Sequence, residues 1–173
     1  IEKIDDKNPA NNNGSTPLFV AAQNGHYDIC KLIIDSVDEK NPANKKGDTP
    51  LHMAAKKGNF EICKLFLANI GHKNPGNNVG NTPFHLAAQN GNFDICKYIC
   101  DNVTDIRPER SDGSSPLLLA IHRCQLKIAK LLIESDADNI RADVLYCWRL
   151  LRSYMCLVGI AALLSSLCIL FSI

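Results

Sequence analysis

The fold of this chain is decided by one stretch of sequence, Gly47-Asp48-Thr49-Pro50-Leu51-His52-Met53-Ala54-Ala55-Lys56-Lys57-Gly58. Its pattern of residue types returns at a fixed interval of 33 residues, once before it and twice after it. The interval is carried by three sets of residues: Thr16-Pro17, Thr49-Pro50, Thr82-Pro83 and Ser115-Pro116; Gly25, Gly58 and Gly91; Asn8-Pro9, Asn41-Pro42 and Asn74-Pro75. Self-similarity at one fixed period predicts a solenoid of stacked supersecondary units rather than a single closed core.

Within each unit, the residue types predict two helices joined by a tight turn. In the first unit, Thr16 suits a helix N-cap, and the proline after it suits the first helical position, where a missing N–H costs nothing. Leu18 and two alanines then pack inward, and Gly25 permits a turn with positive φ. In the second helix we expect an apolar stripe and an exposed charged face. The residues expected to be buried are Ile29, Cys30, Leu32 and Ile33, and those expected to be exposed are Asp28 and Lys31.

The pattern Gly-x-Thr-Pro-Leu-His-x-Ala-Ala-x-x-Gly, with four registered copies, resembles the core signature of ankyrin-repeat proteins. The resemblance covers about residues 1–142 and implies an all-α ankyrin-repeat solenoid, with a helix–turn–helix and a β-turn finger in each repeat. It places repeats at about 13–45, 46–78, 79–111 and 112–142. Residues 1–12 align with 34–45, so we expect them to be the end of a truncated repeat. The fourth copy departs from the pattern, because Cys124 replaces the turn glycine.

The cysteines and histidines have plain structural interpretations. Cys30, Cys63 and Cys96 recur at the repeat period, where the family usually carries a small aliphatic residue, so we expect buried thiols. The eight cysteines include no Cys-x-x-Cys pair, and a reducing compartment fits them. For His52 and His85, the resemblance implies hydrogen bonds within the turn network. Phe19 and Leu118 occupy the same position in the other copies, a replacement that no catalytic role would survive.

Composition and motifs argue against an enzyme. The 173 residues carry a net charge of +1, which gives no global field that favours nucleic acid. The sequence contains no glycine-rich phosphate loop, no His-Glu-x-x-His and no Gly-x-Ser-x-Gly. We therefore expect a non-catalytic protein without a cofactor or a metal site.

The last part of the chain differs from the repeats. Residues 155–173 are nineteen residues without a charge, and at about 1.5 Å rise per residue they nearly cross a hydrocarbon layer of ~30 Å. Arg149 and Arg152 lie in the preceding segment, 143–154, and favour the cytosol for the repeats. We expect a transmembrane helix after a juxtamembrane segment. A buried helix that caps the array and a spurious tail both stay open.

The resemblance also implies where a partner binds, because ankyrin-repeat proteins use their finger tips and the exposed face of their first helices. By register, the candidate protein-binding residues are Lys45, Lys46, Asp48, Lys56, Lys57, Asn78, Asn81, Gln89, Asn90, His122 and Arg123. This surface is rich in amides around four lysines, which suits an acidic or polar segment of another protein. Solvated side chains without a dedicated partner are an equally open interpretation.

The sequence is therefore interpreted as a protein–protein interaction scaffold with its repeats in the cytoplasm, tethered to a membrane by a single C-terminal helix. Two alternatives stay open. One is the cytosolic ankyrin portion of an ion channel truncated in its first membrane helix. The other is a soluble regulatory or adaptor subunit with a spurious tail.

Overall fold

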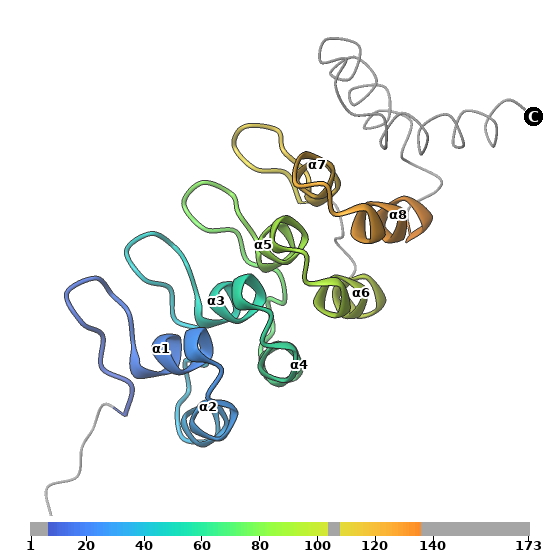
Figure 1. The fold of residues 1–173 in the computed structure, drawn as a ribbon. Coiled ribbons are helices and arrows are strands. Elements are labelled where there is room, and N and C mark those ends of the chain that lie inside the picture. Colours follow the sequence, from blue (N-terminus) through green and yellow to red (C-terminus); the bar gives the residue numbers. More distant parts are fainter. Residues whose placement is uncertain (1–6, 104–107, 136–173) are drawn as a thin grey trace, which may run out of the picture. The chain divides into compact units, whose positions relative to one another are not determined.

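The structure, a computed structural model, describes residues 7–103 and 108–135. These ranges contain four helix pairs and no β-strand: α1 (Pro17–Asn24) with α2 (Tyr27–Ile34), α3 (Pro50–Lys57) with α4 (Phe60–Asn69), α5 (Pro83–Asn90) with α6 (Phe93–Asn102), and α7 (Pro116–His122) with α8 (Leu126–Ser135). Figure 1 shows the first helices of the pairs in one layer, the second helices in another, and the fingers on the opposite side of the first helices. The predicted all-helical repeat architecture is confirmed for the described residues.

Each first helix begins at a capped hydroxyl residue. The Thr16 side chain accepts the backbone N–H of Phe19 at 3.2 Å, and a proline takes the first helical position. The same cap is present at Thr49, Thr82 and Ser115. The first three of these helices end at a glycine with φ of 81–82°, a conformation in which a side chain is strained. The Thr-Pro and Gly of the repeated stretch thus set both ends of the helix.

The first helices stack through small side chains. α3 packs between α1 and α5, and α5 packs in turn against α7. Ala54 and Ala55 are fully buried at these contacts, next to the buried Leu51. The inward packing expected of Leu18 and the two alanines that follow it in α1 is confirmed. Because alanine adds only a methyl group, neighbouring helix axes approach closely along the whole array.

The fingers are β-turns that are hydrogen-bonded to one another. Gly47 N–H donates to the Asn44 carbonyl at 2.9 Å and closes the turn before α3, and the other three fingers have the same bond. Backbone bonds then join each finger to the next: Lys45 N–H to the Asn13 carbonyl (3.1 Å), Asn78 N–H to the Lys46 carbonyl (3.1 Å), and Ser111 N–H to the Val79 carbonyl (3.3 Å). The finger surface is therefore a connected row rather than four separate loops.

One part of the burial pattern expected for the second helix is wrong. Cys30 is buried and Asp28 and Lys31 are exposed, as expected, but Ile29 is 48% exposed and Leu32 is 71% exposed. The residue equivalent to Ile29 in each later unit is only 2% exposed. The difference arises because α4, α6 and α8 pack against the second helix of the preceding unit, whereas the described residues place no helix on that side of α2.

The fourth unit keeps the turn geometry without the glycine. Cys124 has φ of 56°, the one positive value at a non-glycine residue within the described ranges. The Gln125 N–H still donates to the Ala120 carbonyl at 2.8 Å, as the His26 N–H does to Ala21 in the first unit. A cysteine in the left-handed region costs about 1–2 kcal/mol, so α7 and α8 keep their connection under strain.

The chain divides into two compact units, at residues 1–135 and 136–173. The expected juxtamembrane segment 143–154 and the expected transmembrane helix 155–173 lie outside the described residues. Within the described residues, no helix has the length and apolar character needed to cross a membrane.

Candidate protein-binding face

The buried histidine of α3 and of α5 ties its unit to the next finger. His52 Nδ1 accepts the backbone N–H of Thr49 at 3.1 Å, and His52 Nε2 lies 2.8 Å from the carbonyl oxygen of Asn81. His85 makes the equivalent bonds to Thr82 at 3.2 Å and to the Ser114 carbonyl at 3.0 Å. Because Nδ1 accepts, the proton resides on Nε2 and is donated across the boundary between units. These bonds agree with the structural role expected of the two histidines.

Burial keeps these imidazoles neutral. Desolvation lowers the pKa of His85 to about 4, and it also lowers the pKa of His52 below its ordinary value. The hydrogen bonds to carbonyl oxygens act in the opposite direction and are the smaller effect. Both rings are therefore unsuited to proton transfer with a ligand near neutral pH.

Three of the candidate binding residues use their side chains in the hydrogen bonding of the array itself, and a fourth, Asn81, accepts a bond from His52 through its backbone carbonyl. The bonds are Asn77 Nδ2 to Asp48 Oδ1 (2.7 Å), Asn78 Nδ2 to the Lys45 carbonyl (3.0 Å), Asn90 Nδ2 to the Leu86 carbonyl (2.8 Å), and His52 Nε2 to the Asn81 carbonyl (2.8 Å). The amide oxygen of Asn81 is also buried. Asp48, Asn78, Asn81 and Asn90 therefore have a structural role, which leaves fewer of their polar atoms for a partner.

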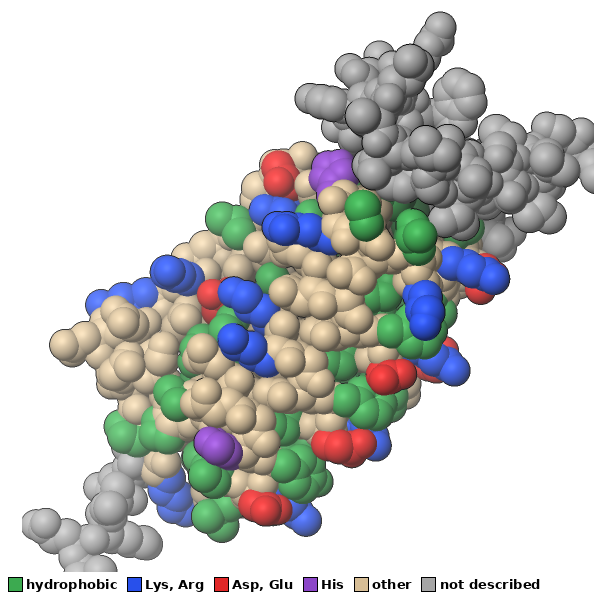
Figure 2. Space-filling model, in the orientation of Figure 1, with side chains coloured by type: hydrophobic (Ala, Val, Ile, Leu, Met, Phe, Trp, Pro, Cys, Tyr) green, Lys and Arg blue, Asp and Glu red, His purple; other side chains and the backbone are tan. Residues whose placement is uncertain are grey.

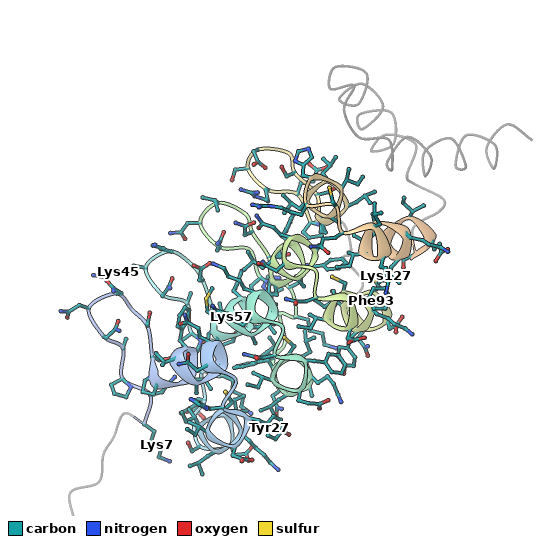
Figure 3. The ribbon with its side chains drawn as sticks, viewed as in Figure 1. Lys7, Tyr27, Lys45, Lys57, Phe93 and Lys127 are labelled. Carbon is teal, nitrogen blue, oxygen red and sulfur yellow. The ribbon has the colours of Figure 1, made fainter. Side chains whose placement is uncertain are left out.

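The four candidate lysines are exposed. Lys45 and Lys46 lie at the finger before α3, and Lys56 and Lys57 lie in the last turn of α3, where the helix dipole favours a cation. Figure 3 shows Lys45 at the tip of the finger and Lys57 at the end of the helix, so the lysines form two pairs rather than one cluster. No ion pair within residues 7–103 and 108–135 engages any of the four.

The C-terminal ends of the first helices carry a row of paired polar residues. The pairs are Gln23-Asn24, Lys56-Lys57, Gln89-Asn90 and His122-Arg123, in the order in which the helices stack. Amide pairs therefore alternate with positions that carry a basic residue, and Lys56-Lys57 and Arg123 are separated by two units. With neighbouring helix axes 8–10 Å apart, this separation is roughly 16–20 Å. Lys56, Lys57, His122 and Arg123 are all exposed.

Charge is unevenly spread between the two helix layers. In Figure 2, the acidic side chains gather mainly over the second helices, among lysines, while the surface over the first helices and fingers is largely uncharged and polar with scattered Lys and Arg. Lys64 pairs with Glu61 at 3.0 Å in α4, and Lys130 with Glu134 at 3.7 Å in α8. Lys64 and Lys130 thus have acidic partners on their own helices, whereas no ion pair within the described residues engages the lysines of the second unit's finger and first helix.

The cysteines that recur at the repeat period, Cys30, Cys63 and Cys96, are buried thiols, as expected. Burial raises the pKa of Cys30 to about 11, and it raises the pKa of Cys63 and Cys96 further. At neutral pH these sulfurs stay protonated and behave as small apolar side chains. The described residues contain no group of three or more side chains placed to hold a metal ion.

Sequence reasoning missed two sets of asparagines that hold the units together. Asn8, Asn41 and Asn74 each accept a backbone N–H from the first helix ten residues later, at 3.0, 3.1 and 3.3 Å. Asn59 Nδ2 donates to the Ala22 carbonyl at 2.8 Å, and Asn92 Nδ2 to the Ala55 carbonyl at 2.6 Å, each in the preceding unit. These asparagines recur every 33 residues in the sequence. The recurrence marks them as important to the repeat, but it does not identify the backbone groups with which they form hydrogen bonds.

These features define a class of protein, a helical solenoid whose units are joined by repeated side-chain and finger hydrogen bonds. The family model described as ankyrin repeats (three copies) matches residues 1–76 and 66–143. The chain belongs to the ankyrin-repeat family, whose repeats generally bind other proteins and are typically non-catalytic interaction modules. No curated protein compared with the chain matches it.

Proposed function

We propose that this array binds an acidic, extended segment of another protein along its finger tips and the ends of its first helices. The observation that carries the proposal is the exposure of Lys45, Lys46, Lys56 and Lys57 without an acidic partner among the described residues. Complementary charge speeds association and selects among partners more than it adds affinity. The lysines therefore steer the encounter with the partner. The other polar residues at the C-terminal ends of the first helices fix the position of the bound segment along the array.

The distance between the basic residues at the ends of α3 and α7 sets the spacing of acidic groups that a partner segment needs. An extended chain advances about 3.3 Å per residue, so acidic groups about five or six residues apart reach both Lys56-Lys57 and Arg123. Gln23 and Gln89 are half-buried beside these residues. Their amides can donate to and accept from the peptide groups of a bound segment.

The experiment that tests this function compares two variants of equal charge in affinity capture. One carries Lys45, Lys46, Lys56 and Lys57 changed to Gln, and the control carries Lys31, Lys64, Lys97 and Lys130 changed to Gln on the second helices. We expect a specific bound protein that the first variant loses and the control keeps. If both variants lose the captured protein equally, the attraction is non-specific and due to charge alone. If neither variant loses it, the four lysines do not contribute to binding.

We propose in addition that residues 155–173 hold the array at a membrane with the repeats in the cytosol. The support is the sequence alone: nineteen uncharged residues that follow Arg149 and Arg152. Fused to a reporter, residues 141–173 should stay with membranes during alkaline carbonate extraction. Protease added to intact vesicles should digest the repeats.

Two results would distinguish the membrane-anchored scaffold from its two alternatives, a soluble adaptor and the ankyrin portion of a channel. A reporter fusion that stays in the supernatant would favour a soluble adaptor. Further hydrophobic segments in the transcript after residue 173 would favour the ankyrin portion of a channel, because a single helix cannot line a pore.

A further inference from the structure

The first residues of the four second helices form an apolar row along the array. The row consists of Tyr27, Phe60, Phe93 and Leu126, one from each helix pair. Tyr27 is 40% exposed, Phe93 is 36% exposed and Leu126 is 42% exposed, while Phe60 is half-buried. Large apolar side chains that gather in one exposed row mark an interaction surface, whereas single exposed ones need no explanation.

This apolar row lies beside the polar residues at the C-terminal ends of the first helices. In the first three units, a turn of two residues joins the two helices, so that α3, for example, ends at Lys57 and α4 begins at Phe60. Three steps from one Cα to the next span at most about 11 Å. Figure 3 shows Lys57 at the end of α3, and Tyr27 and Phe93 on the second helices α2 and α6. A bound segment that follows the ends of the first helices therefore also meets the apolar row.

The ring of Phe60 is held by its neighbours. Tyr98 of α6 meets it edge to face, with 5.9 Å between the ring centroids and 87° between the ring planes. The Nζ atom of Lys64 lies 5.2 Å from the centroid of the Phe60 ring. Both contacts are favourable for an aromatic ring, so this member of the row is ordered before a partner arrives. A surface that is ordered beforehand loses less conformational entropy on binding.

Charge decides which side chains of a partner can face the apolar row. The residue after Tyr27, Phe60 and Phe93 is acidic and exposed in each case, namely Asp28, Glu61 and Asp94. Like charges disfavour the approach of an acidic segment to the second helices. Such a segment therefore turns its carboxylates toward the basic ends of the first helices, and only its uncharged side chains suit the apolar row.

The spacing of the units selects the conformation of an extended segment. Neighbouring helix axes are roughly 8–10 Å apart. A polyproline II chain has three residues per turn and a rise of about 3.1 Å per residue, so the same side returns after about 9.3 Å. A β-strand returns to the same side after two residues, about 6.6 Å, and falls out of step with the units. Two turns of polyproline II also cover about 19 Å, which matches the separation of Lys56-Lys57 from Arg123.

We propose that the array binds an acidic polyproline II segment that places an apolar side chain on the apolar row at every third residue. The inference rests on the proposed function, and it assigns the conformation of the partner segment and a second feature of its sequence. Polyproline II leaves its backbone carbonyls without internal hydrogen bonds, and the amides of Gln23 and Gln89 can donate to them. Apolar and aromatic surfaces suit this conformation, because the segment is largely ordered before it binds.

The test uses three labelled peptides of nine residues, titrated against the full chain by fluorescence anisotropy. All three have two glutamates six positions apart and proline at most other positions. The first peptide has three leucines at every third position, the second has the same composition with its leucines at alternate positions, and the third has serine in place of the leucines of the first. We expect the first peptide to bind about tenfold or more tightly than the other two.

A pair of matched variants locates the leucine contacts. The row variant changes the three exposed members of the apolar row: Tyr27→Ser, Phe93→Ser and Leu126→Ser. The control variant changes three exposed apolar residues outside the row: Val20→Ser, Ile29→Ser and Leu32→Ser. The row variant should lose the preference for the first peptide, and the control variant should keep it. Circular dichroism checks that both variants stay folded, and the comparison of the peptides on the wild-type chain needs neither variant.

Three results would overturn the inference: equal binding of the first and third peptides, tighter binding of the second peptide than the first, or loss of the preference in both variants alike. These results differ from a failure of the proposed function. If leucine has no effect but changing Lys45, Lys46, Lys56 and Lys57 to Gln still weakens all three peptides, the proposed function stands and the apolar row is not part of the binding face. If the lysine changes weaken none of the peptides, the proposed function fails, and this inference fails with it.

Discussion

His52 Nε2 donates to the carbonyl oxygen of Asn81, at 2.8 Å, from the first helix of one unit to the finger of the next. The bond connects residues 29 positions apart in the sequence, and His85 repeats it with Ser114. The fingers that precede α5 and α7 are thereby fixed to the preceding first helix by a buried, neutral imidazole. In the third and fourth units the histidine bonds thus hold the finger in register with the first helix of the preceding unit, while the finger of Lys45 and Lys46 is held by its backbone bonds to the neighbouring fingers.

These histidines make the array sensitive to acid. The unfolded chain takes up a proton at each histidine near pH 6.5, whereas the folded His85 does so only at about 4. The unfolded state therefore binds more protons between these values, and the free energy of unfolding falls as pH drops from about 6.5 toward 4, by up to about 1.4 kcal/mol per pH unit for one histidine. Above pH 7 this contribution is constant.

Urea unfolding at a series of pH values measures the effect. His85→Leu copies the residue that the fourth unit carries at this position, Leu118, and should reduce the slope between pH 6.5 and 4. A slope equal to that of the wild type would show that His85 does not contribute.

Leu51→Ala should destabilise the array more than His52→Phe. Truncating a buried leucine costs roughly 2–5 kcal/mol. The loss of a hydrogen bond costs about 1 kcal/mol, and the Asn81 carbonyl keeps a second donor, the Asn77 N–H at 2.8 Å. Phe19 already fills the histidine position in the first unit. Denaturant melts of both variants decide the order, and a reversed order would mean that the repeat register is wrong.

Cys124→Gly should stabilise the protein by about 1 kcal/mol, because glycine adopts the left-handed conformation of this turn without strain. The matched reverse change, Gly91→Ala, should destabilise. Gly91 has φ of 81°, and a Cβ there would meet Gln125 Oε1 at 2.7 Å. Thermal melts of the two variants test the pair, and a loss of stability in Cys124→Gly would show that the turn is not strained.

Much of this fold could be predicted from the sequence because the repeated residues act locally. Thr16, the proline after it and Gly25 set the ends of a helix through their own backbone preferences, and these operate in the same way in every unit. The exposure of Ile29 could not be predicted in this manner. It depends on whether another helix pair lies beside α2, which the composition of α2 does not reveal.

The candidate face was predicted less completely than the fold. Register placed Lys56 and Lys57 on the exposed end of a first helix, and the structure has them there. The repeat register could not show that Asp48 accepts a hydrogen bond from Asn77, or that the Asn78 side chain donates to the Lys45 carbonyl. Side chains that bridge units require the relative placement of two fingers, and a single repeat does not contain that information.

Excess chelator and reductant should leave the circular dichroism and melting temperature of the repeats unchanged. Cys30, Cys63 and Cys96 are buried among apolar side chains, and burial raises the pKa of each thiol, so they pack as small hydrophobes. A large loss of helicity in either reagent would show that cysteines act as ligands or cross-links.

The most direct test of the proposed function is the binding of a defined acidic probe. The probe is a fluorescein-labelled peptide of ten residues with two glutamates six positions apart in a Gly-Ser background, titrated against the full chain by fluorescence anisotropy. The account predicts binding that changing Lys45, Lys46, Lys56 and Lys57 to Gln weakens by about tenfold or more, which is about 1.4 kcal/mol, and that weakens further as salt shortens the Debye length below ~8 Å. The matched variant with Lys31, Lys64, Lys97 and Lys130 changed to Gln should bind as the wild type does. Equal weakening by the two variants, or no binding by the wild-type chain, would contradict the assignment of the finger and first-helix surface as the binding face.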